Sequence, residues 1–264
     1  MGIFDSSRTR VVPVFNHLAN ADPIGTTWLT PLLRLGSYSA QTLDFDPGHL
    51  SSGQPRWWGK NERRLDPPRE LLYWLAANAS EPSSDKMWGV DATREKRKKL
   101  VARDPATIAE AIRLLKTRTR PGVWYVLEGK SAPDVFIETT NALIVVEGKR
   151  TERKATGSTT WMPKRSQMLR HMDAAYEIRG AKRVLGLMVV EGDGGTGAVN
   201  VSPHWANQAT QQILAQTLTD SLPHRSVDER SQIATGFLGV TTWQRLCAAF
   251  SIEWPPMDDN IPSD

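Results

Sequence analysis

The residues of this sequence best suited to chemistry are Asp134, Glu147 and Lys149, in the stretch PDVFIETTNALIVVEGK that ends at position 149. Paired carboxylates are ligands for hard divalent cations such as Mg²⁺. An ammonium beside them can orient a water or stabilise charge that develops on a phosphoryl oxygen. A cation, a water and an ammonium together are what hydrolysis of a phosphodiester needs. The tripeptide Glu-Gly-Lys also occurs at 128–130, so the elements must decide which copy is the site.

Two short runs rich in β-branched residues, 134–139 and 142–148, flank Thr140-Asn141 and predict a hairpin with a tight turn. Opposed pairs are then 139 with 142, 137 with 144 and 134 with 147. The Cβ atoms of Asp134 and Glu147 would lie about 5 Å apart, and Lys149 would share their face. The second tripeptide is therefore the predicted site, since no strand with an opposed aspartate precedes the first. The same alternation assigns one face to Phe136, Leu143 and Val145 and the other to Val135, Ile137, Ile144 and Val146.

The remaining elements follow from periodicity and from Pro and Gly. Helices are predicted over 69–79, 93–104, 105–117 and 163–180, the last closing at Gly180, and near 202–222 and 227–250. Strands are predicted over 123–129 and 183–192 besides the hairpin, and 192–197 is expected to be a turn. Residues 1–66 are expected to form irregular strands and loops. Three antiparallel strands and a fourth, parallel one reached through a helix give a mixed sheet flanked by helices.

Pro133-Asp134 followed by Glu147-Gly148-Lys149, on a hairpin that precedes a helix and a strand, resembles the signature of the PD-(D/E)XK nuclease superfamily. The resemblance covers roughly residues 105–192. It implies an α/β, restriction-endonuclease-like fold with an αβββαβ core. One domain over 1–264 would then comprise an N-terminal elaboration (1–104), the core (105–192), C-terminal helices (193–250) and a tail (251–264) that is expected to be disordered.

The resemblance implies roles for single residues. Asp134 and Glu147 would be ligands of Mg²⁺ or Mn²⁺, and Lys149 would be the catalytic lysine. Gln167 stands where some members carry a glutamine on the following helix. The Gly148 carbonyl is a further candidate ligand, because no side chain shields it. Members often add one more acidic residue, and Glu70, Glu110 and Glu128 all remain open, with Glu128 the candidate for the cleft.

Basic residues cluster in the runs 94–99, 149–154 and 164–170. Each run could track a phosphate backbone or could be a solvated helix face. The candidate nucleic-acid contacts are Lys149, Arg150, Arg153, Lys154, Lys164, Arg165 and Arg170. His171 is expected to contact phosphate or to be packed, and Trp161 either stacks on a base or packs at the entry of a helix. Residues 148–161 are expected to form a mobile loop over the cleft.

Composition narrows the remaining classes. The single cysteine, Cys247, excludes a disulfide framework, and neither a signal peptide nor a membrane-length apolar run is visible. A soluble, cytoplasmic protein without a membrane partner is expected. A formal net charge of +4 permits a polyanion partner, with DNA favoured over RNA. The open alternatives are a nucleic-acid-binding module without catalysis, an interaction subunit of a larger defence or repair assembly, a homodimer, and a ribonuclease.

Overall fold

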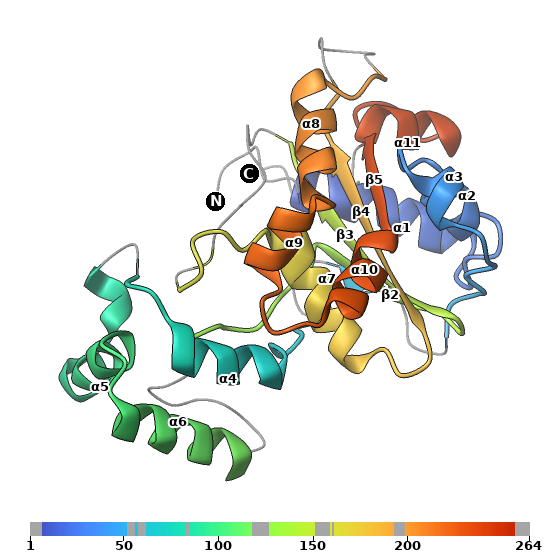
Figure 1. Ribbon diagram of the computed structural model, residues 1–264. Helices are drawn as coiled ribbons and strands as arrows, with labels where there is room; N and C mark the ends of the chain where they lie inside the picture. Colours follow the sequence, from blue (N-terminus) through green and yellow to red (C-terminus); the bar gives the residue numbers. More distant parts are fainter. Residues whose placement is uncertain are drawn as a thin grey trace.

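The computed structural model describes residues 7–51, 56–57, 62–82, 85–117, 127–150, 159, 161–192 and 199–256. Within them, a mixed sheet of five strands in the order β1-β2-β3-β4-β5 lies between two layers of helices (Figure 1). The strands are β1 (Arg56–Trp57), β2 (Val135–Glu138), β3 (Ala142–Gly148), β4 (Arg183–Val190) and β5 (Phe237–Thr242). The pairs β1–β2 and β2–β3 are antiparallel, whereas β3–β4 and β4–β5 are parallel. The expected mixed α/β sheet flanked by helices is confirmed.

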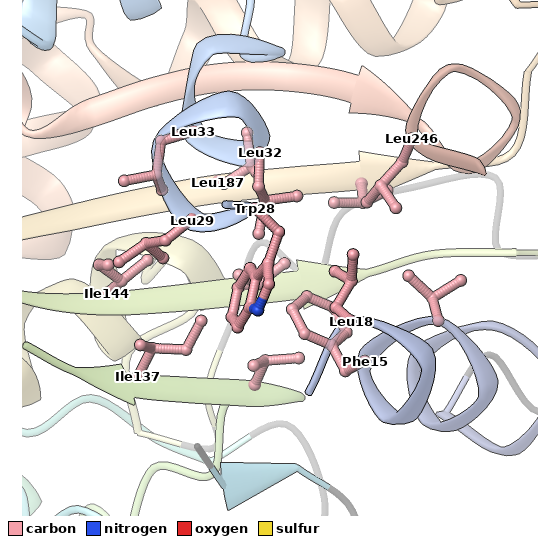
Figure 2. Packing of buried hydrophobic residues seen from close by; sticks show 14 of the residues in the cluster. Phe15, Leu18, Trp28, Leu29, Leu32, Leu33, Ile137, Ile144, Leu187 and Leu246 are labelled. Atoms are coloured by element: carbon pink, nitrogen blue, oxygen red, sulfur yellow. The ribbon is translucent and has the colours of Figure 1, made fainter. Parts of the chain in front are cut away.

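The side chains of β2 and β3 divide between the two faces of the sheet as the alternation predicts. Val135, Ile137, Ile144 and Val146 face one cluster with Leu187 of β4. This cluster is closed by α1 (Val12–Ala21), α2 (Leu29–Arg34) and α11 (Trp243–Ala249). Figure 2 shows Phe15, Leu18, Trp28 and Leu29 in one packed cluster with Ile137 and Ile144.

Phe136, Leu143 and Val145 face the opposite layer of helices. That layer consists of α7 (Gln167–Ile178), α8 (Pro203–Gln212), α9 (Ala215–Ser221) and α10 (Val227–Thr235). Gly180 has a φ of +59° just beyond α7, which confirms it as the predicted end of the helix. The two apolar layers fix the plane of the sheet, and they thereby fix the position of the C-terminal end of β3.

Helices α4 (Arg69–Asn78), α5 (Asp91–Val101) and α6 (Pro105–Thr117) pack on one another away from the sheet (Figure 1). They follow the predicted ranges. Their apolar side chains form a third cluster with Trp88, Leu127, Trp161 and Met162. We call α4–α6 with the short helix η3 (Asp85–Trp88) the helical lobe. In the sequence, the helical lobe is inserted between β1 and β2.

The lobe corrects the predicted core of residues 105–192. The first helix of that core, α6, belongs to the lobe and does not cover the sheet. Of the predicted strand 123–129, residues 127–129 are not in a strand, and 123–126 lie outside the described residues. The strand that pairs with β2 on the side away from β3 is β1, from the N-terminal region. Helix α1 and strands β1, β2 and β3, followed by α7 and β4, still have the order αβββαβ, with α2, α3 (Ser39–Thr42) and the lobe as additions.

The expectation of strands and loops in residues 1–66 is wrong in part, because α1–α3 form there besides β1. In α1 the apolar residues Val12, Val14, Phe15 and Leu18 are all buried, and Pro13 lies in the first turn, where a missing N–H costs nothing. The predicted helix 202–222 is two helices, α8 and α9, and 227–250 contains β5 between α10 and α11. The first part of the tail is ordered, since Ile252 and Trp254 pack against the core, while 257–264 lie outside the described residues.

Candidate active site

The β2–β3 hairpin has the predicted register. Val135 pairs with Val146 and Ile137 with Ile144, so Asp134, one residue before β2, lies opposite Glu147. The turn is held by Thr139, whose Oγ1 accepts hydrogen bonds from the N–H groups of Ala142 (2.7 Å) and Asn141 (3.2 Å). This is the local hydrogen bonding that threonine offers in turns. The turn sequence therefore sets the register that brings the two acids together.

Lys149 lies between an acid and an amide. Its Nζ is 2.8 Å from Glu147 Oε1 and donates to Gln167 Oε1 at 3.3 Å. Gln167 is the first residue of α7, so the start of that helix meets the end of β3 at this point. The side chains of Glu147 and Lys149 are only 5% and 10% exposed. The structure thus brings three of the predicted catalytic residues into one buried contact.

Asp134 completes the group and has an unusual pKa. Its Oδ2 accepts a hydrogen bond from the Gly148 N–H at 2.7 Å, and its Oδ1 accepts one from Ser7 Oγ at 3.2 Å. Burial and the negative charge of Glu147 nevertheless raise the pKa of Asp134 to about 7. A bound cation would relieve that repulsion, and Asp134 is therefore placed to bind a proton or a cation as conditions require.

Glu147 is held in the ionised state by its neighbours. Burial alone would raise its pKa, but His171 and Lys149 outweigh burial and lower it. His171 Nε2 lies 3.1 Å from Glu147 Oε2, and His171 Nδ1 is 2.6 Å from the hydroxyl of Ser131. The two acids therefore titrate apart, which is typical of paired carboxylates with different tasks. His171 is a packed histidine beside the acids, as one of the two sequence alternatives has it.

The acids fit a divalent cation in one specific respect. Glu147 Oε2 is buried and has no hydrogen-bond partner among the described residues, because the approach of His171 does not meet hydrogen-bond geometry. An unsatisfied carboxylate oxygen beside a second carboxylate is a donor set that Mg²⁺ accepts, because this ion needs only one or two carboxylates and keeps its waters. No group of three or more His, Cys, Asp or Glu side chains that could hold a metal occurs in the described part of the chain.

Gly148 has a packing role that the sequence did not suggest. A Cβ at this position would lie 2.8 Å from Trp243 Cζ2 and 3.2 Å from Val11 Cγ2. The glycine thus lets α11 and the N-terminal segment approach the end of β3. Its N–H holds Asp134, whereas its carbonyl as a metal ligand stays a prediction.

The three candidates for an additional acid lie elsewhere. Glu70 and Glu110 belong to the helical lobe, where Glu110 is 2.7 Å from Lys96. Glu128 is buried, with Oε1 2.9 Å from Arg165 and 3.4 Å from Arg170. Glu128 is therefore engaged in an ion cluster through Oε1, and its role in the metal site stays a prediction.

The prediction that Arg165 contacts nucleic acid is wrong. Its side chain is 0% exposed and is ion-paired to Glu128 and Asp173. Asp173 in turn contacts His224 and Arg225, and burial is outweighed there by these partners, so its pKa lies well below the usual range. A phosphate cannot reach Arg165 in this arrangement, and the cluster instead ties α7 to the segment between α9 and α10.

Three other candidate nucleic-acid contacts, Lys164, Arg170 and Arg150, lie among the described residues. Lys164 is 73% exposed, and Arg170, 23% exposed, donates to the carbonyls of Gly129 and Lys130. Arg150 donates to Thr9 Oγ1 at 3.0 Å. Arg153 and Lys154 lie outside the described residues, as do 151–158 of the predicted loop and 193–197 of the predicted turn at 192–197. Trp161 is packed against Trp88 at 5.4 Å and is only 5% exposed, so it does not present its ring to a base.

Two contacts at the site were missed by sequence reasoning. Ser7, which donates to Asp134, lies far away in the sequence, and no local signal points to it. Ser131, which bonds His171, is positioned by a two-way backbone bridge to Leu65. The position of His171 beside the acids could have been predicted, because Gln167 and His171 are four residues apart and share one face of α7.

A scan against protein-family models, a search of curated proteins and a search of solved structures each gave no match to this chain. Among the described residues, no helix has both the length and the apolar character needed to span a membrane. Function must therefore be argued from the site itself.

Proposed function

We propose that this protein is a Mg²⁺-dependent nuclease of the PD-(D/E)XK type that hydrolyses phosphodiester bonds in DNA. The observation that carries the proposal is the convergence of Asp134, Glu147 and Lys149 at the end of one hairpin, with Lys149 Nζ 2.8 Å from Glu147. The elements α1, β1, β2, β3, α7 and β4 follow one another in the order αβββαβ, and this order supports the restriction-endonuclease-like fold.

Each residue then has a separate task. Asp134 and Glu147 would hold the cation, which when bound would polarise a phosphoryl oxygen and lower the pKa of a bound water. Lys149 carries a positive charge into a buried site, where it stabilises negative charge that develops on the phosphoryl group. Gln167 accepts a hydrogen bond from Lys149 and so fixes the direction of the ammonium. His171 holds Glu147 from the other side.

Cleavage of supercoiled plasmid tests the proposal. The purified protein is expected to nick or linearise plasmid with Mg²⁺ or Mn²⁺, but not with EDTA. Asp134→Ala, Glu147→Ala and Lys149→Ala should each lower the rate by at least about a hundredfold. The matched control is Lys130→Ala, because Lys130 ends the other Glu-Gly-Lys copy and is 54% exposed. Unchanged cleavage by all three site variants would sink the proposal, and single-stranded RNA in a parallel reaction tests the choice of DNA.

A second candidate is a nucleic-acid-binding or interaction subunit on the same fold without catalysis. It is favoured by the extent to which the chain satisfies its own site. Both carboxylate oxygens of Asp134 accept hydrogen bonds, and Ser7 of the N-terminal segment η1 (Ser7–Val11) supplies one of them. Binding of DNA without cleavage under any divalent cation would select this alternative.

A further inference from the structure

Positive charge is concentrated on one helix of the lobe. Helix α5 has five Lys and Arg residues against two acidic residues, so its charge is +3 of the chain's formal net +4. Only Leu100 of α5 is buried. The helix is therefore held to the lobe by few apolar contacts, and its sequence is not explained by packing.

The other two basic runs do not offer a comparable surface among the described residues. In the run 164–170, Arg165 is fully buried and Arg170 is directed to Glu128 and to backbone carbonyls. Most of the run 149–154 lies outside the described residues. On α5, by contrast, Lys98 and Lys99 are both exposed, and the ion pair of Lys98 with Glu95 is long, at 3.8 Å.

Helix α5 is also tied to the candidate active site. Arg97 donates to the carbonyls of Met87 and Trp88, and its guanidinium lies 5.6 Å from the ring of Trp161. Trp161 belongs to the segment that leads into Gln167 at the start of α7. A second link is the backbone bridge from Leu65, which leads into the lobe, to Ser131, which bonds His171. The lobe is thus anchored on the two segments that carry site residues.

We infer that the exposed face of α5 is a docking surface for the phosphate backbone of a DNA duplex. The lobe would hold the duplex while the candidate active site at the end of the β2–β3 hairpin acts on it. The choice of a duplex rests on the proposed function, because the lobe is anchored beside a site suited to a phosphodiester. A duplex carries one negative charge per about 1.7 Å of its axis, and exposed lysines are suited to so dense a charge. The contact is with the backbone and is independent of sequence.

The experiment is a salt titration of the binding of a fluorescein-labelled DNA duplex to the full chain in EDTA, measured by anisotropy. Lys98→Gln/Lys99→Gln removes two charges from α5 and keeps good helix formers there. Loss of two phosphate contacts should lower the magnitude of the salt slope by about 1.8 and weaken binding about sixtyfold at about 0.1 M salt. Lys98→Arg/Lys99→Arg should retain wild-type binding.

The matched control is Arg34→Gln/Arg245→Gln, which changes the net charge equally but lies on exposed positions of α2 and α11. It should bind almost as tightly as the wild type. Equal weakening of both double variants, or no weakening by the α5 variant, overturns the inference. Binding of the wild type to phosphatidylserine vesicles but not to the duplex overturns it as well.

The binding and cleavage readouts separate the two proposals. Duplex binding that depends on α5, combined with no plasmid cleavage under Mg²⁺, refutes the nuclease and supports the docking surface. Cleavage combined with binding that ignores the α5 substitutions does the reverse.

Discussion

At the scale of single residues, the chemistry of the site depends on the difference between its two acids. Glu147 lies 2.8 Å from Lys149 Nζ and 3.1 Å from His171 Nε2, whereas Asp134 accepts hydrogen bonds from Ser7 and from the Gly148 N–H and faces the charge of Glu147. Two acids that lie opposite each other in one hairpin thus have pKa values shifted in opposite directions. The cation proposed for the site would bind most tightly at pH values at which Asp134 has lost its proton.

The raised pKa of Asp134 predicts a pH dependence of stability. Its pKa is about 3.8 for an unfolded aspartate and about 7 in the fold, so the folded state holds the proton more tightly. In EDTA this group should therefore lower the free energy of unfolding as the pH rises from about 4 through about 7, with no further loss above. We expect the Tm of the wild type to fall relative to that of Asp134→Asn over this window, by on the order of 5 °C.

Mg²⁺ provides the check on that result. Because proton and cation compete for Asp134, added Mg²⁺ should raise the Tm of the wild type more at pH 8 than at pH 6, and should leave Asp134→Asn nearly unchanged. Parallel Tm curves for the two proteins in EDTA would show that Asp134 titrates as an ordinary aspartate.

A second residue prediction concerns Gly148, whose role is packing or ligation. Gly148→Ala places a methyl group 2.8 Å from Trp243 and should cost about 1–3 kcal/mol in the free energy of unfolding. Because alanine keeps the backbone carbonyl, the affinity for Mn²⁺ measured by calorimetry should stay within about threefold if the fold persists. Gly129→Ala is the control, since a Cβ there meets no atom within 4 Å.

At the scale of elements, what could be predicted was local. The hairpin register followed from alternation and a tight turn, because a shift by one residue would move Val135 and Ile137 from the face covered by α1 and α2 to the opposite face of the sheet. Helix α7 and strand β4 followed from their periods. Strand β5 was missed because FLGVTT stands between two helices and continues their apolar pattern, although Val240, Thr241 and Thr242 are β-branched.

Long-range partners account for the other errors at this scale. Arg165 and Lys164 are adjacent cations in the sequence, yet the first is 0% exposed and the second 73%. The difference depends on Glu128 and Asp173, and their proximity is a property of the fold. No spacing rule reveals that Ser7 meets Asp134, because the contact joins segments separated by 127 positions.

The buried cluster around Arg165 predicts how α7 is held. Arg165→Met should cost about 3–5 kcal/mol in the free energy of unfolding, because Glu128 and Asp173 would lose a buried cation. Chemical denaturation measures the loss. Lys164→Met is the matched control, and its exposed pair with Asp220 at 3.5 Å should contribute less than about 1 kcal/mol. Equal costs for the two variants would contradict the assignment of Arg165 to the core.

At the scale of the whole molecule, the described residues build three apolar clusters, two on the sheet and one in the helical lobe. The lobe is inserted between two strands that pair with each other, so its ends must return to the same edge of the sheet. This insertion could not be read from the sequence, since α6 and β2 are close in the chain and look like parts of one core. A lobe with its own cluster is free to open without the sheet.

Trp161 links the lobe to the rest of the molecule, and its removal tests that independence. It packs on Trp88 and Arg97 within the lobe cluster. Trp161→Ala should cost about 3–5 kcal/mol of local stability, and hydrogen exchange should accelerate in α4–α6 while β3 and β4 keep their protection. Trp28→Ala, in the cluster that covers β2 and β3, should instead accelerate exchange throughout the sheet. Equal acceleration of lobe and sheet by Trp161→Ala would mean that the two open as one unit.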